Sequence, residues 1–104
     1  MLVNIESPYA GNVEENIKYA RRCMLDCLRR GEYPIASHLL YTQGGILDYT
    51  IPEERELGIR ASFALKKLAH NTIVYVDRGI SSEMEKGIAL ANWHDRYVEI
   101  RKLD

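Results

Sequence analysis

The chain has 104 residues, a formal net charge of −1 at pH 7 and an isoelectric point near 6.3. A hydrophobic content of 46% and a charged content of 28% are typical of a globular protein, and this length predicts one domain with a single core. The near-neutral charge and the lack of a long apolar run exclude a basic nucleic-acid surface and a membrane-spanning helix. We therefore expect no nucleic-acid partner, no membrane segment and no signal peptide.

The first part of the chain is predicted to form a strand, a helix and a second strand. Residues 2–6 favour a short strand, and residues 12–30 repeat apolar side chains at helical spacing. Asn12 and Glu15 are arranged as a capping box at the start of this helix, and Gly31 is a typical helix stop. Residues 33–40 are predicted as the second strand.

The second part continues the alternation. Residues 42–50 form a predicted loop, and residues 52–70 a helix with proline in its first turn. The expected inner face of that helix consists of Leu57, Ala61, Ala64 and Leu68. Residues 73–76 are predicted as a strand, 82–92 as a helix and 97–101 as the last strand.

This alternation predicts an α/β fold: a three-layer, doubly wound parallel sheet of the flavodoxin or Rossmann type. We expect four strands in the order 2-1-3-4, so the topological switch falls between the first and third strands. Ligands bind such sheets outside the carboxyl ends of the strands. The loops that follow the first and third strands are therefore expected to open onto one crevice.

The loop after the first strand reads Ser7, Pro8, Tyr9, Ala10, Gly11. Proline stiffens the turn, and glycine permits a close backbone approach to a ligand. The helix that follows offers free N–H groups to a phosphate or a sugar hydroxyl, and Tyr9 offers a ring for stacking on a base. The alternative is an ordinary strand-to-helix turn with a capped helix.

The loop after the third strand carries Asp77, Gly79, Ser81 and Ser82. Asp77 is a candidate to hold a sugar hydroxyl, to orient a catalytic group or to protonate a leaving base. Its alternative role is to cap the turn at Gly79. The two serines either bind a phosphate or cap the next helix.

Glu85 also has two interpretations. Ser82 and Glu85 fit the S-x-x-E capping box, which requires no function. Alternatively, Glu85 is a carboxylate nucleophile that attacks an anomeric carbon and forms a covalent glycosyl-enzyme intermediate. Gly87 leaves space beside it.

Side chains elsewhere carry weaker signals. His38 is either a hydrogen-bond donor to a ligand or a supporting core histidine. The loop over residues 42–54, which contains Asp48, is long enough for a lid or a dimer contact. Cys23 and Cys27 are predicted to be core residues and not metal ligands, because no second Cys or His pair accompanies them. We expect no metal site.

Four segments together resemble the small phage and bacterial relatives of the nucleoside 2-deoxyribosyltransferases: VNIESPYAG, PIASHLLYTQ, IPEERELGI and IVYVDRGISSEMEKGIALA. The family motif M-E-x-G-x-A is matched by Met84, Glu85, Gly87 and Ala89. The resemblance implies that Glu85 is the nucleophile. It also implies that Ser7, Tyr9 and Gly11 line the sugar or phosphate pocket and that Ser81 and Ser82 face the 5′ group.

By the same resemblance, Asp77 lies in the region of the family's acidic residue before the nucleophile, and Asp48 and Glu54 are candidates to recognise the base. The position of Glu6 is usually small in the family. The resemblance implies one domain over residues 1–104 that binds a nucleoside or nucleotide and needs no metal or organic cofactor. It further implies a homodimer or higher homo-oligomer in the cytoplasm of a bacterium or a phage-infected host.

Three functions remain open at this stage. The first is an enzyme of the deoxyribosyltransferase or N-glycosidase type that cleaves or exchanges an N-glycosidic bond. The second is a non-catalytic module that captures a nucleotide, for example a signalling nucleotide. The third is a structural oligomer with a vestigial crevice.

Overall fold

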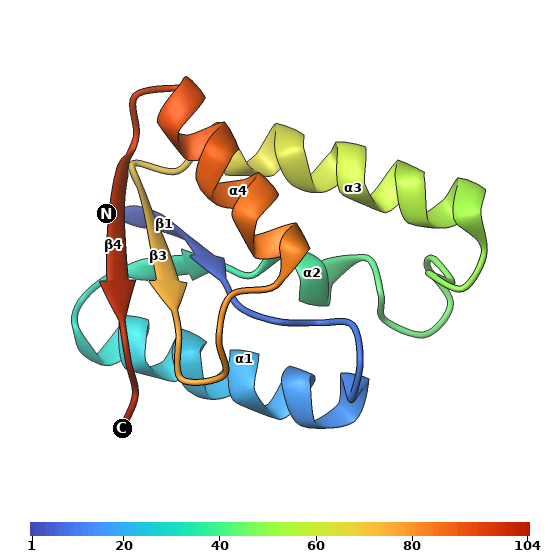
Figure 1. Cartoon of the computed structure of the whole chain (residues 1–104), viewed down its shortest axis with the longest axis horizontal. Helices are drawn as coiled ribbons and strands as arrows, with labels where there is room; N and C mark the ends of the chain where they lie inside the picture. Colours follow the sequence, from blue (N-terminus) through green and yellow to red (C-terminus); the bar gives the residue numbers. More distant parts are fainter.

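The fold contains four strands and four helices (Figure 1), and a computed structural model describes all residues from 1 to 104. The strands are β1 (Leu2–Glu6), β2 (Tyr33–Ile35), β3 (Asn71–Tyr75) and β4 (Tyr97–Arg101). The helices are α1 (Val13–Arg29), α2 (Ser37–Leu40), α3 (Pro52–Lys66) and α4 (Ser82–Trp93). None of the helices is long and apolar enough to cross a membrane.

All four strands pair in parallel, in the order β2-β1-β3-β4. Ile5 of β1 lies beside Ile73 of β3, which in turn lies beside Glu99 of β4. Figure 1 shows α1 on one face of the sheet and α3 and α4 on the other. The predicted α/β fold class and strand order are therefore confirmed.

The apolar core lies between the sheet and α1. It consists of Val3, Ile5, Ile73 and Tyr75 from the sheet and Tyr19, Cys23 and Cys27 from α1, all almost completely buried. Burial of this apolar surface is the main force that holds α1 on the sheet. Both cysteines are free thiols within this core, as the sequence predicted.

The opposite face of the sheet is polar at its centre. Side chains alternate along a strand, so Asn4 and Glu6 of β1 point away from the α1 core, as does Thr72 of β3. All three are buried, with exposed fractions of 0%, 4% and 3% respectively. A buried carboxylate and a buried amide under α3 and α4 indicate that this face of the sheet has a role besides packing.

The second strand differs from the prediction. Only residues Tyr33–Ile35 pair with β1, and Ser37–Leu40 form the short helix α2 instead. The hydroxyl of Thr42 donates to the carbonyl of His38 over 2.8 Å, which supports the helical turn. The predicted strand over 33–40 is thus wrong in its second half, and His38 is presented by a helix.

Helix α3 ends at Lys66, before the predicted end, and turns a different face to the sheet. Gly58 and Ser62 are its buried residues, whereas Leu57 and Leu68 are 57% and 66% exposed. The predicted inner face of α3 is therefore wrong.

Arg101 anchors the C-terminal strand. Its guanidinium donates to both carboxylate oxygens of Glu32, over 2.9 and 3.0 Å, and to the Tyr75 hydroxyl over 3.1 Å. Arg101 is only 7% exposed, so this paired arginine ties β4 to the segment before β2.

Candidate functional site

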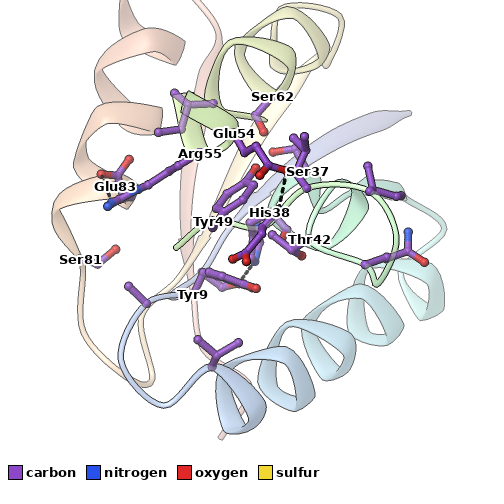
Figure 2. A pocket seen from close by; sticks show the side chains of 18 of the residues that line it. Tyr9, Ser37, His38, Thr42, Tyr49, Glu54, Arg55, Ser62, Ser81 and Glu83 are labelled. Atoms are coloured by element: carbon purple, nitrogen blue, oxygen red, sulfur yellow. Dashed lines mark hydrogen bonds and ion pairs between the residues drawn. The ribbon is translucent and has the colours of Figure 1, made fainter. Parts of the chain in front are cut away.

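A cavity of about 980 Å³ opens at the carboxyl end of β1, on the polar side of the sheet. Its walls come from the loop after β1, the short helix α2, the loop over residues 42–50, helix α3 and the first turn of α4 (Figure 2). This is the topological switch point of the order β2-β1-β3-β4. The expected convergence of the two loops on one crevice is confirmed, because both loops contribute to the lining.

Most of the candidate binding residues line this cavity. They are Ser7, Tyr9, Ala10, Gly11, His38, Asp48, Ser81 and Ser82. Gly11 has a φ of 97°, so its backbone adopts a conformation that favours glycine. The residues that the structure does not bring to the lining are Pro8, Asp77, Gly79 and Glu85.

Asp77 lies outside the cavity lining and holds the C-terminal segment. It accepts hydrogen bonds from the Tyr19 hydroxyl over 2.6 Å and from the backbone N–H groups of Leu103 and Asp104 over 3.0 and 3.1 Å. Burial acts to raise the pKa of Asp77, but these hydrogen bonds outweigh it and lower the pKa to about 2. In this arrangement Asp77 is an ionised acceptor that closes the chain's end onto α1.

Helix α4 begins one residue earlier than the predicted capping box requires. The N-cap is Ser81, whose hydroxyl accepts the Met84 N–H over 3.2 Å. Ser82 is therefore the first helical residue, and the predicted pairing of Ser82 with Glu85 in a capping box is wrong. Glu85 is exposed to solvent, and its role as a nucleophile stays a prediction.

The carboxylate that α4 does present to the cavity belongs to Glu83. Arg55 of α3 reaches across toward it in Figure 2, with its Nη2 atom 3.7 Å from Glu83 Oε1. Glu83 also pairs with Lys86 over 3.3 Å. Both partners are substantially exposed, so this ion pair is weak and free to open for a ligand.

The floor of the cavity holds a buried ion pair. Lys66 Nζ of α3 lies 3.1 Å from Glu6 Oε2, and the Asn4 amide donates to the same oxygen over 2.8 Å. Burial raises the pKa of the Glu6 carboxyl, while Lys66 and Asn4 act against that rise. A Cβ atom on Gly87 of α4 would overlap the Glu6 carboxylate, so the glycine provides the space for it.

Ser7 and His38 form a second polar pair in the lining. Ser7 Oγ and His38 Nε2 are 2.9 Å apart. Burial, with a smaller effect of the Lys66 charge, lowers the pKa of His38 to about 4. The imidazole is therefore neutral at physiological pH. One of its ring nitrogens forms a hydrogen bond with Ser7, and the other is able to form one with a ligand.

Two tyrosines form an aromatic wall (Figure 2). The Tyr9 ring lies edge-on to Tyr49, with centroids 6.0 Å apart, and edge-on to His38 at 6.3 Å. A Cβ atom on Gly58 of α3 would overlap the Tyr49 ring, so this helix glycine lets the ring lie against α3. Aromatic rings at a cavity wall suit a planar ligand such as a nucleobase.

Of helix α3, the sequence indicated only Glu54 as a candidate site residue, and Glu54 lines the cavity. Arg55, Ile59, Ser62, Phe63 and Lys66 line the cavity, and their spacing of three or four residues places them on one face of the helix. That spacing was visible in the sequence. The prediction instead assigned the apolar residues of the opposite face to the interior, and these residues are mostly exposed.

A parallel α/β sheet with a ligand-sized cavity at its switch point defines the class: a small doubly wound α/β protein. The chain belongs to a family described as a domain of unknown function, DUF7768, which matches residues 1–101. No curated protein matches this sequence.

Among solved structures, the protein is similar to a 2-deoxyribosyltransferase from the psychrotolerant bacterium Bacillus psychrosaccharolyticus. The TM-score is 0.76, with 98% of this chain and 72% of that chain covered. Sequence identity is 13%, so the likeness shows a shared fold.

Proposed function

We propose that this protein binds a nucleoside or nucleoside 5′-monophosphate in the cavity and cleaves or exchanges its N-glycosidic bond. The observation that carries the proposal is the composition of the cavity: an aromatic wall from Tyr9 and Tyr49 beside carboxylates at Glu6 and Glu83. A base is recognised by stacking, whereas a reacting sugar requires carboxylates. The fold shared with a 2-deoxyribosyltransferase adds support.

The chemical step requires a carboxylate close to the sugar. A Glu oxygen attacks the anomeric carbon, the bond to the base breaks, and the base leaves with the bonding electron pair and takes a proton from water. Water, or the nitrogen of a second base, then attacks the same carbon and releases the Glu. Two residues of the first turns of α4 are candidates: Glu85, by the family resemblance, and Glu83, which lines the cavity.

Capture of a ligand without turnover is the second candidate function. It is favoured by the present positions of the two carboxylates, because Glu83 is paired with Arg55 and Glu85 is exposed outside the cavity. Under this function the residues over 7–11, Ser81 and Ser82 still hold a sugar or phosphate, and no bond is broken.

A panel of nucleosides and 5′-monophosphates separates the two functions. Thermal shift detects every specific binder by mass action, and chromatography detects free base. We expect free base from at least one compound, with loss of release in either Glu85→Gln or Glu83→Gln and retained binding in both. Glu14→Gln, an exposed change on α1, is the matched control.

Each outcome assigns a role. Loss of release in Glu85→Gln alone supports the nucleophile that the resemblance implies, and loss in Glu83→Gln alone moves that role to Glu83. Binding without any free base across the panel establishes ligand capture. Neither binding nor release would refute the proposed function.

A further inference from the structure

The polar floor of the cavity contains an acceptor that no protein group uses. Both contacts of the Glu6 carboxylate, from Lys66 and from Asn4, are made to Oε2, which leaves Oε1 without a protein partner. Glu6 is 4% exposed and lines the cavity. Oε1 receives no hydrogen bond from the protein, so a ligand hydroxyl that reaches the cavity floor is able to donate to it.

The neighbouring ammonium offers donors at the same place. Lys66 lines the cavity with a side chain that is 13% exposed, and its Nζ atom contacts Glu6 Oε2 at 3.1 Å. An ammonium has three N–H donors, and the carboxylate occupies one of them. Glu6 and Lys66 therefore present an acceptor and a donor side by side.

This pair is held in place. Gly87 packs against the Glu6 carboxylate from α4, and the Asn4 amide donates a hydrogen bond to Oε2. A buried ion pair adds little net stability compared with an apolar pair of similar volume, so packing alone does not account for it. A rigid donor–acceptor pair is the arrangement expected of a group that recognises a ligand.

Resting on the proposed nucleoside ligand, we infer that Glu6 and Lys66 bind the neighbouring 2′- and 3′-hydroxyls of a ribose, so that the protein selects ribonucleosides over 2′-deoxyribonucleosides. Glu6 Oε1 accepts from one hydroxyl, and Lys66 donates to the oxygen of the other. The base then lies against Tyr9 and Tyr49, which line the same cavity.

The charges of the cavity floor argue against a phosphate as the group that binds there. Lys66 is already paired with Glu6, so the floor has no excess positive charge for a phosphate. A carboxylate beside the ligand would repel a phosphate oxygen and accept from a hydroxyl. The phosphate of a 5′-monophosphate would instead lie toward Ser81 and Ser82 at the start of α4.

The test measures affinities of the full chain by calorimetry for matched ribo- and 2′-deoxyribonucleosides with each common base. We expect the ribonucleoside of the best-binding base to bind at least about tenfold more tightly, because its deoxy analogue cannot make the charge-assisted hydrogen bond to Glu6 Oε1. In Glu6→Gln this ratio should fall below about threefold, since the charge-assisted bond is lost.

Two further variants keep the result interpretable. Lys66→Gln should also lower the ratio of ribonucleoside to deoxyribonucleoside affinity. The double variant Glu6→Gln/Lys66→Gln removes both charges, so no lone buried charge is left to unfold the protein. Glu54→Gln changes a carboxylate of the lining away from this pair and should alter the affinities for both sugars by the same factor.

Equal affinity for both sugars, or a preference for the deoxy form, would overturn the inference while leaving the proposed function intact. A tenfold ratio that persists in Glu6→Gln and in the double variant would also overturn it. The same holds if affinity follows the exocyclic amine of the base and not the 2′-hydroxyl. If no nucleoside of either kind binds, the proposed function fails as well, which distinguishes the two failures.

Discussion

Glu6 at the end of β1 fills the space above the Cα atom of Gly87 in α4, so that no side chain fits at position 87 while the carboxylate stays in place. Glu6 cannot swing aside at low cost, because Asn4 and Lys66 bind its Oε2 atom. The contact between a strand end and a helix glycine therefore fixes both the floor of the cavity and the distance of α4 from the sheet.

The first prediction concerns Gly87→Ala. In an ordinary exposed helix this change stabilises by about 1 kcal/mol. Here we expect the free energy of unfolding to fall by about 1–3 kcal/mol, because the new methyl group overlaps a buried carboxylate. Urea unfolding measures the change. Asn92→Ala, at an exposed position of the same helix, is the control, and it should be neutral or slightly stabilising. A stabilised Gly87→Ala would contradict the contact.

Gly58→Ala should behave differently, although the substitution is the same. The added methyl group overlaps the Tyr49 ring, which belongs to a partly buried loop residue and is able to move. We expect little change in stability, within about 1 kcal/mol, because the helix gain offsets the lost ring contact.

Nucleoside affinity shows whether Gly58→Ala has an effect that the stability measurement does not detect. A displaced Tyr49 ring should weaken nucleoside binding severalfold, by about 1 kcal/mol, as Tyr49→Ala should. Calorimetry on both variants measures this effect. Wild-type affinity in Gly58→Ala would show that the Tyr49 ring does not contact the ligand.

A third prediction follows from the neutral imidazole of His38. Its pKa is lowered from 6.5 to about 4 in the folded protein, so the unfolded chain takes up this proton first. The stability contributed by the neutral ring is complete above pH 6.5 and is lost as the pH falls from 6.5 toward 4. Urea unfolding at several pH values should show a steeper loss for the wild type than for His38→Gln. Parallel curves would contradict the lowered pKa.

A fourth prediction concerns Asp77 and the chain's end. Its pKa is lowered from 3.8 to about 2, so the stability that its ionised form contributes is complete above pH 3.8 and is lost as the pH falls through 3.8 toward 2. Asp77→Asn should be less stable than the wild type at pH 6 by about 1 kcal/mol or more, because charge-assisted bonds to Leu103 and Asp104 are weakened. The two proteins should converge in stability near pH 2.

Base release provides the control for Asp77. If this residue only anchors the chain's end, Asp77→Asn should retain ligand affinity and base release at pH 7. A loss of release with normal binding would instead restore the catalytic role that the sequence suggested for it.

The sequence was sufficient to predict the strand order, because alternating strands and helices allow few topologies and the crossovers are right-handed. It was not sufficient at residues 37–40, where a short apolar run is compatible with either a strand or a helix. The prediction of the inner face of α3 failed for a related reason. Leu57 and Leu68 are apolar yet exposed, and the inner face holds glycine and serine.

The candidate site was predictable in its loops but not in its carboxylates. Two adjacent serines both fit an N-cap, and the use of Ser81 in place of Ser82 shifts the helix start by one residue. Each residue turns a helix by about 100°, so such a shift decides which carboxylate of the first turns points at the cavity. Lys66 was invisible as a partner of Glu6, because only the fold brings positions so distant in sequence together.

The unequal faces of the sheet have an evolutionary consequence. The tightly packed side that includes Tyr19, Cys23 and Cys27 supplies cohesion independently of what the cavity holds. Paired substitutions at positions 6 and 66, which leave no lone buried charge, are then able to change ligand preference while the other half keeps the chain folded. Such a molecule is a practical scaffold for laboratory selection of new small-molecule specificities.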